Sequence, residues 1–431
     1  MRPHMSRKAT AVAALALVLP ALATNSTQAE SHHDDGRGTV DSIRFATFNA
    51  SLNRRNSGDL SAELAVPGSA QPDTVAEIIQ RTRPDVLLIN EFDFDPVALI
   101  DFQQNYLDLP HGDAAPIDYP YSFIAPSNTG VPSGFDYNND GSVGGPNDAH
   151  GFGFFEGQFG MVVLSMYPID LEGVRTFQMF KWKDMPGALL PDDPATPQPG
   201  DWYTPGPELD SFRLSSKSHW DVPIEIGEAT VHFLVSHPTP PVFDDPPFTP
   251  AGVDFNGRRN HDEIRFWADY VGPGGNIGAY IYDDDGHYGG LEPGALFVIA
   301  GDQNSDPHDG DSIPGSAQLL LDHPLVSTKV TPSSPGAVEQ NDLQGGANDT
   351  HLSDPAFDTA DFNDVAPGNL RADYVLPRKN LRIIDAGVFW PLSDDPLFAL
   401  VGLFNDPVPG GFPSSDHRLV WIDVTNDDFT N

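Results

Sequence analysis

The hydrophobic residues of this chain gather into short runs, and each run is followed by polar residues or turn formers. The runs are rich in Val, Ile, Leu and Phe, a pattern typical of strands that are buried on both faces. We therefore predict seven strands, at Ile43–Phe48, Val86–Ile89, Gly160–Leu164, Val231–Ser236, Ala295–Ala300, Arg371–Leu376 and Leu419–Val424.

Helical patterns are fewer than strand patterns. Thr74–Thr82 follows Asp73, a residue type that caps helices, and stops before Pro84. Asn260–Tyr270 carries apolar residues at helical spacing. Strands mixed with few helices predict a layered α/β fold, in which sheets pack together and helices lie outside them.

Long segments rich in Pro, Gly and Asp separate these elements, in keeping with a content of 42 Pro and 40 Gly. Loops of this length in a compact domain usually carry function, so we expect them to surround a site. They cover residues 126–158, 183–212, 238–258 and 305–370. We expect one domain over residues 43–425, preceded by a linker at 30–42 and followed by a tail at 426–431.

The chain is strongly acidic, with 62 acidic and 23 basic side chains and a formal net charge of −39. This balance argues against a protein held on DNA by a broad basic face, since such binding neutralises phosphates with Lys and Arg. It also argues against anchorage on anionic lipid. The chain has no Cys, which excludes thiol nucleophiles and thiolate metal sites.

The first residues have the pattern of an export signal. Arg2, Arg7 and Lys8 precede an apolar run over residues 11–23, and small residues follow. The run is shorter than the roughly 20 residues that span a bilayer. We therefore predict that residues 1–29 are a secretory signal peptide, that the protein is secreted, and that it makes no stable membrane insertion.

The polar residues that end the predicted strands carry the chemistry. Oxygen ligands of this kind suit Mg²⁺, Mn²⁺ or Ca²⁺ better than a soft metal. Two imidazoles from separate strands add acid–base groups that titrate near neutral pH. The residues at these strand ends are Asn49, Glu91, His237, Asp302, Asn304, Asp373, Asp416 and His417.

Six short motifs in order, FN, NE, SH, GDQN, RADY and SSDH, resemble the endonuclease/exonuclease/phosphatase superfamily of deoxyribonuclease I-like enzymes. The resemblance extends over about residues 43–425. It implies a four-layer α/β/β/α sandwich of two packed mixed sheets. It also implies a hydrolase that acts on phosphoric ester bonds with the help of a divalent cation.

The resemblance assigns roles to individual residues. Glu91 would be the main metal ligand, with Asn49 and Asp416 beside it, and the ion would be Mg²⁺, Mn²⁺ or Ca²⁺. Asp302 and Asn304 would hold the phosphate, the attacking water or a second ion. Each residue also has a simpler interpretation, such as Asn49 capping a turn.

The same resemblance gives the two imidazoles catalytic roles. His417 would act on the attacking water or stabilise the charged phosphorane, and Asp373 would orient its ring. His237 would stabilise the phosphate or protonate the leaving group. The alternatives are a hydrogen-bonded histidine at the end of a strand for His237, and a surface ion pair for Asp373.

Two further features lie in the loops. Asp136, Asn138 and Asp140 match the first half of a calcium loop, and an Asx-rich turn is the alternative to a structural Ca²⁺. Arg258 and Arg259 are adjacent cations that lead into the second predicted helix. They are candidates for clamping a substrate phosphate, with local ion pairs as the alternative. Lys217 is a weaker candidate of the same kind.

These observations favour a secreted, metal-dependent phosphoesterase that cleaves phosphomonoesters or phosphodiesters and acts as a monomer. The second hypothesis is an extracellular endonuclease, for which nucleic acid would be a substrate only. A sphingomyelinase-like enzyme is the third, with residues 152–155 or 243–248 as apolar loop tips. A calcium-binding surface protein without activity is disfavoured by the complete set of acid–base and ligand residues.

Overall fold

The computed structural model describes residues 42–244, 253–274, 276–403 and 412–429. Its larger sheet has six strands, in the order β12-β13-β1-β2-β4-β3. The bounds of these strands are β1 Ile43–Asn49, β2 Val86–Asn90, β3 Tyr121–Phe123, β4 Met161–Ser165, β12 Arg382–Val388 and β13 Val420–Thr425. Only β1 and β2 run parallel to each other within this sheet, among the pairings of the described strands.

The second sheet has five strands, in the order β11-β8-β7-β6-β5. They are β5 Arg175–Thr176, β6 His219–Ile226, β7 Ala229–Ser236, β8 Leu296–Asp302 and β11 Asp373–Pro377. Strands β7 and β8 are parallel, and the other described pairs are antiparallel. A small ribbon is formed by β9 Ala360–Asp361 and β10 Asn369–Leu370.

Aromatic side chains join the two sheets face to face. Phe45 of β1 and Phe233 of β7 have ring centroids 5.5 Å apart, and Phe123 of β3 lies edge-on to Trp220 of β6 at 5.0 Å. All four side chains belong to one buried cluster. Removal of so much aromatic surface from water is the main force that holds the sheets together.

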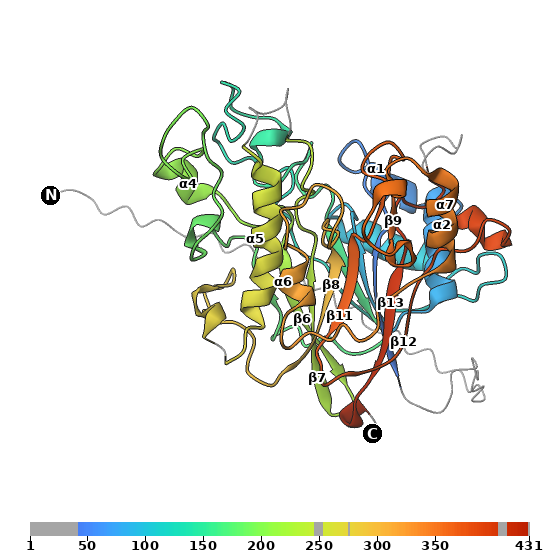
Figure 1. The fold of residues 1–431 in the computed structure, drawn as a ribbon. Helices are drawn as coiled ribbons and strands as arrows, with labels where there is room; N and C mark the ends of the chain where they lie inside the picture. The colour runs from blue at the N-terminus through green and yellow to red at the C-terminus, as the bar shows by residue number, and fades with distance from the viewer. Residues whose placement is uncertain (1–41, 245–252, 275, 404–411, 430–431) are drawn as a thin grey trace.

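Helices cover the outer faces of the sheet pair (Figure 1). Helix α2 (Ala70–Thr82) buries Val75 and Ile79 in the cluster of the six-stranded sheet. Helix α5 (Phe255–Tyr270) buries Ile264 and Trp267 against the five-stranded sheet. The predicted four-layer α/β/β/α sandwich is therefore confirmed. The other α-helices are α1 Asp59–Leu64, α3 Pro96–Phe102, α4 Pro207–Ser211, α6 Gln318–Leu321 and α7 Pro335–Gln344.

All seven predicted strands are present, with ends shifted by a few residues. The short strands β3, β5, β9 and β10 and the longer strands β6 and β12 were not predicted. Strand β6 holds Pro223, a residue that is unfavourable in strands, and β12 is an edge strand whose exposed face breaks the apolar pattern. Strand β6 pairs with the adjacent strand β7, and β12 pairs with β13 near the end of the chain. Hydrophobic periodicity alone does not identify these partners.

The predicted start of the first helix is wrong. Helix α2 begins at Ala70 with Ser69 as its N-cap residue, so Asp73 lies in the first turn and is not the cap. Pro72 is tolerated there because N–H groups in the first turn have no partner within the helix. The second helix also starts earlier, where the Asp254 side chain accepts a hydrogen bond from Gly257 N at 3.1 Å.

The two ends of the chain differ in what can be tested. The predicted signal peptide at 1–29 and almost all of the linker at 30–42 lie outside the described residues. At the other end, Asp427–Phe429 forms a short 3₁₀ turn, and the Phe429 ring is buried in the core cluster. The packed structure therefore extends past the predicted boundary at 425. Among the helices that the structure describes, none combines the length and apolar character needed to cross a membrane.

One buried carboxyl group lies among other acids. Asp358 is only 2% exposed. Its burial, together with the negative charges of Asp306, Asp309 and Asp354, raises the pKa of Asp358 to about 9. In the unfolded chain the same group has an ordinary pKa near 3.8. The unfolded state therefore holds fewer protons between these values, so stability falls as the pH rises from about 4 to about 9.

We predict that Asp358→Asn stabilises the protein at pH 8 and has little effect at pH 4. The amide carries no charge and can donate hydrogen bonds to the neighbouring carboxylates, so we expect a gain of about 1–3 kcal/mol in the free energy of unfolding. Urea denaturation in EDTA at both pH values measures this gain. Asp342→Asn, which changes an exposed acid on α7, is the control. An equal gain at both pH values would contradict the charge argument.

Candidate active site

Strand ends from both sheets meet at one place. Parallel pairing of β1 with β2 sets Asn49 beside Asn90, and Glu91 follows directly. In the other sheet, antiparallel pairing sets Asp373, the first residue of β11, opposite Asp302, the last residue of β8. Strand β1 packs against both β8 and β11, so the two sets of polar residues face each other.

Asp302 is the centre of this arrangement. Its Oδ2 accepts a hydrogen bond from Asn49 Nδ2 at 3.1 Å and lies 3.4 Å from His237 Nε2 and 3.6 Å from His417 Nε2. Burial opposes the charge of this carboxylate, but His417, His237 and Asn49 outweigh burial and hold the pKa of Asp302 well below its ordinary value. The carboxylate is therefore ionised and faces both predicted imidazoles.

The second carboxylate, Asp373, holds His417 from the other side. His417 Nδ1 and Asp373 Oδ2 are 2.8 Å apart, and the hydroxyl of Thr359 donates to the same oxygen at 2.8 Å. Burial disfavours the imidazolium, but Asp373 and Asp302 outweigh it, so the pKa of His417 lies well above its ordinary value. His417 is thus a positively charged imidazole between two carboxylates, with Asp373 in the orienting position that the sequence predicts.

The pKa of His237 is shifted in the opposite direction to that of His417. Burial, aided by the nearby charge of Lys217, lowers the pKa of His237 to about 4, although Asp302 opposes this shift. Its Nδ1 is buried and has no hydrogen-bond partner among the described residues. The two imidazoles therefore share one carboxylate but differ in protonation, because His417 has two anionic neighbours and His237 has one as well as a cation.

Glu91 lies at the mouth of the site on a left-handed backbone, with φ +60°. Its Oε2 accepts a hydrogen bond from Asn53 Nδ2 at 2.8 Å. Burial and the negative charge of Asp416 raise the pKa of Glu91 to about 7. A buried carboxyl group beside a second acidic side chain is a place where a divalent cation would be stabilised.

A second group of possible ligands lies deeper. Among the described residues, Asp302, Asp373 and His417 each offer one ligand atom, and these atoms lie within 4.8 Å of one another, so the group could hold a metal ion. These three residues differ from the predicted ligands Asn49, Glu91 and Asp416. The His417–Asp373 contact already has the length of a hydrogen bond, so an ion between those two atoms would have to replace a proton.

Asn304 turns the chain after β8. It has φ +51°, its N–H donates to Asp302 Oδ1 at 2.8 Å, and its Nδ2 donates to Pro238 O at 3.2 Å. Asn304 therefore fixes the carboxylate of Asp302 and the loop after His237. The role that the resemblance implies for Asn304, to hold the phosphate, the attacking water or a second ion, stays a prediction.

Several residues that support the site were not predicted. Asn90 Oδ1 accepts from Asp302 N at 3.2 Å, which ties β2 to β8 across the two sheets. On α5, the carboxylate of Glu263 accepts from Ser216 N and Thr239 N, each at 2.6 Å. Asn260 Nδ2 donates to Thr239 O at 2.9 Å and to Gln303 O at 2.8 Å. The sequence predicted the helix that carries Asn260 and Glu263, but only the fold reveals the partners of these buried polar residues.

The two arginines contact main-chain carbonyls, and the phosphate clamp expected of them stays a prediction. Arg259 donates through Nε to Leu214 O at 2.7 Å and through Nη2 to His150 O at 2.6 Å. Arg258 Nη1 lies 3.4 Å from Leu190 O, in the loop before α4. Both guanidinium groups are engaged with main-chain carbonyls, because α5 packs beneath the long loops and must satisfy their polar groups.

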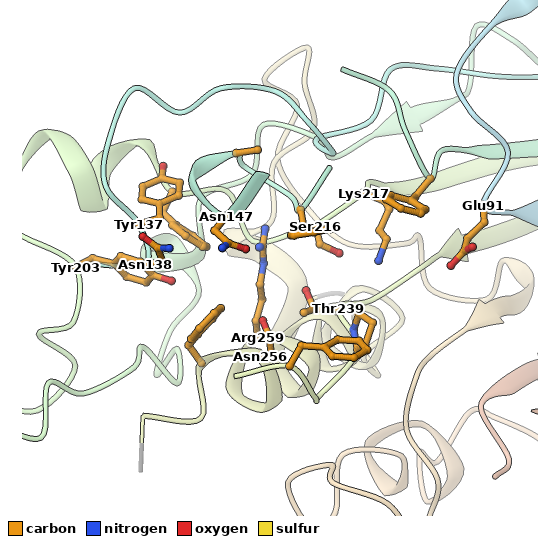
Figure 2. A pocket seen from close by; sticks show the side chains of 17 residues that line it. Glu91, Tyr137, Asn138, Asn147, Tyr203, Ser216, Lys217, Thr239, Asn256 and Arg259 are labelled. Atoms are coloured by element: carbon orange, nitrogen blue, oxygen red, sulfur yellow. The ribbon is translucent and has the colours of Figure 1, made fainter. Parts of the chain in front are cut away.

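Lys217, the weaker candidate, is the cation that faces the carboxylates. It is 7% exposed and lines the same cavity as Glu91 (Figure 2). Burial lowers the pKa of Lys217, and the negative charges of Glu263, Glu91 and Asp302 oppose that shift. An ammonium group in this position can attract the phosphate of a substrate.

The predicted calcium loop forms a turn on the surface. Asp136 accepts from Asp140 N at 3.0 Å and from Gly141 N at 2.9 Å, and Asn138 Nδ2 donates to Asp140 at 3.2 Å. These hydrogen bonds are those of an Asx-rich turn, the alternative to an ion site. The calcium ion itself stays a prediction.

Comparison with known proteins bears on this site. The profile described as "Endonuclease/Exonuclease/phosphatase family" matches residues 46–417. Similar solved structures include an endonuclease/exonuclease/phosphatase from Beutenbergia cavernae, at 16% identity and a TM-score of 0.44, covering 89% of this chain and 71% of that chain. Sphingomyelinase C from Streptomyces griseocarneus has 14% identity and a TM-score of 0.37, covering 89% and 99%. Comparison with curated proteins gives no significant match.

The family profile covers residues 46–417, so it contains every strand end that builds the site. Within that range the structure brings Asn49, Asp302, Asp373 and His417 into contact around one buried carboxylate. The chain belongs to the endonuclease/exonuclease/phosphatase family, and it is a hydrolase that acts on phosphoric ester bonds.

Proposed function

We propose that this protein is a divalent-metal-dependent phosphoesterase that hydrolyses phosphomonoesters or phosphodiesters by in-line attack of water. The observation that carries the proposal is the placing of two imidazoles around one carboxylate. His237 Nε2 and His417 Nε2 lie 3.4 and 3.6 Å from Asp302 Oδ2. A pair of imidazoles with opposite pKa shifts can supply both the proton acceptor and the proton donor that hydrolysis needs.

The cation would be held by Glu91, Asp416 and Asn49. The raised pKa of Glu91, about 7, supports this assignment, since it reflects burial and repulsion from Asp416 that the positive charges of His417 and Lys217 offset only in part. Oxygen ligands of this kind suit Mg²⁺, Mn²⁺ or Ca²⁺, and enzymes of this family typically use divalent metals. When bound, such an ion neutralises charge that develops on the phosphoryl oxygens.

The side chains of the chain divide the remaining work. His417, kept positive by Asp373 and Asp302, would donate from Nε2 to the leaving oxygen, and His237, kept neutral with Nε2 facing Asp302, would accept a proton from the attacking water at Nδ1, which has no hydrogen-bond partner among the described residues. Lys217 would attract the phosphate. This division reverses the roles that the resemblance suggested for proton transfer at the two imidazoles.

The proposed step is balanced without a covalent enzyme intermediate. The oxygen of water forms a bond to phosphorus as the bond from phosphorus to the leaving oxygen breaks. One proton of water passes to His237, and His417 gives one to the leaving oxygen. Asp302 would stabilise the positive charge that His237 gains, since it lies 3.4 Å from the ring.

We also propose that the enzyme is exported and acts as a monomer. The export proposal rests on the basic residues and apolar run within residues 1–29. N-terminal sequencing of the protein released by cells that express the full chain tests it. A product that retains Arg2 and stays inside the cells would contradict it.

We predict that Glu91→Gln lowers hydrolysis at least 100-fold and that EDTA does the same to the wild type. Both changes would remove the bound cation, whose positive charge stabilises the reacting phosphate. The assay uses p-nitrophenyl phosphate and supercoiled plasmid DNA, each with Mg²⁺, Mn²⁺, Ca²⁺ or EDTA. Glu172→Gln, at an exposed acid between β4 and β5 that does not line the cavity beside Glu91, is the control.

The two substrates separate the hypotheses. Release of p-nitrophenol with intact plasmid supports a phosphatase. Plasmid nicking at much higher rates favours the extracellular endonuclease. Full activity of Glu91→Gln would show that the metal assignment is wrong.

We predict that Asp373→Asn lowers kcat about 100-fold and moves the alkaline limb of the kcat/KM profile to lower pH. Loss of the anion at 2.8 Å lowers the pKa of His417, so the imidazole loses its proton at a lower pH. Thr359→Ser, which keeps the hydroxyl donor to Asp373, is the control. An unchanged alkaline limb would remove His417 from the role of proton donor.

We predict inversion of configuration at phosphorus. Direct attack of water on an isotopically labelled chiral thiophosphate ester exchanges one ligand of phosphorus in a single in-line step. ³¹P NMR of the product reads the configuration. Net retention would require two displacements and would rule out the proposed step.

A further inference from the structure

A cavity of about 430 Å³ extends from Glu91 into the space beneath the long loops. Glu91 and Lys217 line one end, and Tyr137, Asn138 and Tyr203 line the other (Figure 2). The volume lies within the range of roughly 300–1,000 Å³ that is usual for small-molecule sites. The cavity thus begins at the proposed metal ligand Glu91 and at Lys217, and none of the proposed catalytic steps uses the rest of it.

The wall of the cavity away from the carboxylates is aromatic. Its rings come from residues 137–159, from residues 203–212, from the segment after His237 and from the first turn of α5, and they are Tyr137, Phe152, Phe159, Tyr203, Phe212, Phe243 and Phe255. The deepest of these rings are fixed against each other. Phe212 has its centroid 4.4 Å from that of Tyr203 and 4.6 Å from that of Tyr137.

The rings at the mouth are exposed in the free protein. Phe152 is 50% exposed and Phe243 is 77% exposed, although both line the cavity. Exposed rings on the rim of a formed cavity mark a binding site, since a bound apolar group would remove them from water. A flat ring that enters here would contact aromatic faces on several sides.

Charge in the cavity differs from charge in the chain as a whole. The chain has 62 acidic and 23 basic residues, yet the residues that line the cavity include one acid, Glu91, and two bases, Lys217 and Arg259. The remaining polar lining is neutral, and it includes Asn138, Asn147 and Asn256. An anion can therefore enter this cavity without meeting the repulsion of the acidic surface.

We propose that the cavity binds the organic group of the phosphoester, and that this group is small and contains an aromatic ring. The inference rests on the proposed function and names its substrate class. The phosphate would lie between Glu91 and Lys217, and the ring would lie among Phe152, Phe243 and the fixed aromatic cluster.

Binding of non-hydrolysable phosphonates tests the cavity without turnover. Isothermal titration calorimetry on the wild-type protein with Mg²⁺ compares benzylphosphonate with ethylphosphonate. We expect benzylphosphonate to bind at least 10-fold more tightly, because its ring is buried among aromatic side chains. Equal affinities, or no binding of either compound, would overturn the inference.

Two exposed phenylalanines of one loop provide a matched pair of variants. Phe152 lines the cavity, whereas Phe154, which is 67% exposed and in edge contact with Phe152 at 5.5 Å, does not. We expect Phe152→Ala to weaken benzylphosphonate about 3- to 10-fold and to leave ethylphosphonate unchanged. Phe243→Ala should behave alike, and Phe154→Ala should change neither affinity more than twofold. Equal losses for Phe152→Ala and Phe154→Ala would contradict the assignment.

Hydrolysis then separates failure of the inference from failure of the proposed function. Benzyl and ethyl phosphates have leaving groups of similar basicity, so a preference for benzyl in kcat/KM reports binding rather than leaving-group reactivity. If the wild type hydrolyses both esters equally well, the function stands and the aromatic preference is wrong. If it hydrolyses no phosphoester with any divalent metal, the proposed function fails, and the phosphonate affinities still decide what the cavity binds.

Discussion

The buried charge of Asp302 is the constraint on which the site depends. The carboxylate is 1% exposed and lies where the two sheets meet. An ionised carboxylate in such a place is stable only when its neighbours supply hydrogen bonds and positive charge. Those neighbours come from both sheets, namely Asn49 and His417 from the six-stranded side and His237 from the five-stranded side. Correct packing of the sheets and correct assembly of the catalytic groups are therefore one event.

Helix α5 extends this dependence from the sheets to the loops. Glu263 is fully buried and binds the N–H groups of Ser216 and Thr239, which flank Lys217 and His237 in the chain. Asn260 binds the carbonyls of Thr239 and Gln303 and so links the ends of β7 and β8. The outer helix of the sandwich thus uses its polar face to position the loops and its apolar face to pack on the sheet.

The distribution of acidic residues has a physical consequence for substrate choice. Most of the 62 acids lie outside the cavity, whose only acidic lining residue is Glu91. A long-range negative potential disfavours approach of extended polyanions at low ionic strength, and salt screens it beyond about one Debye length. A small anion that reaches the cavity meets Lys217 instead, which fits a compact phosphoester better than a nucleic acid duplex.

The sequence by itself determined the strands, the fold class and the identity of the polar residues at the strand ends. These features follow from local pattern, because a buried strand needs a continuous apolar run and its end needs a polar residue or turn. All seven predicted strands are present, and Asn49, His237, Asp302, Asp373 and His417 lie together. Strands β6 and β12 escaped prediction, since β6 holds Pro223, a residue that is unfavourable in strands, and β12 is an edge strand whose exposed face breaks the apolar pattern.

Only the tertiary structure decided what each charged group does. In the sequence, the adjacent arginines are candidates for a phosphate clamp. In the structure, α5 packs so that Arg259 donates to main-chain carbonyls, whereas Lys217 faces the carboxylates. The opposite pKa shifts of His237 and His417 likewise depend on neighbours far away in the chain. Charge, burial and hydrogen bonding act through space over a few ångströms, so residues distant in sequence set them.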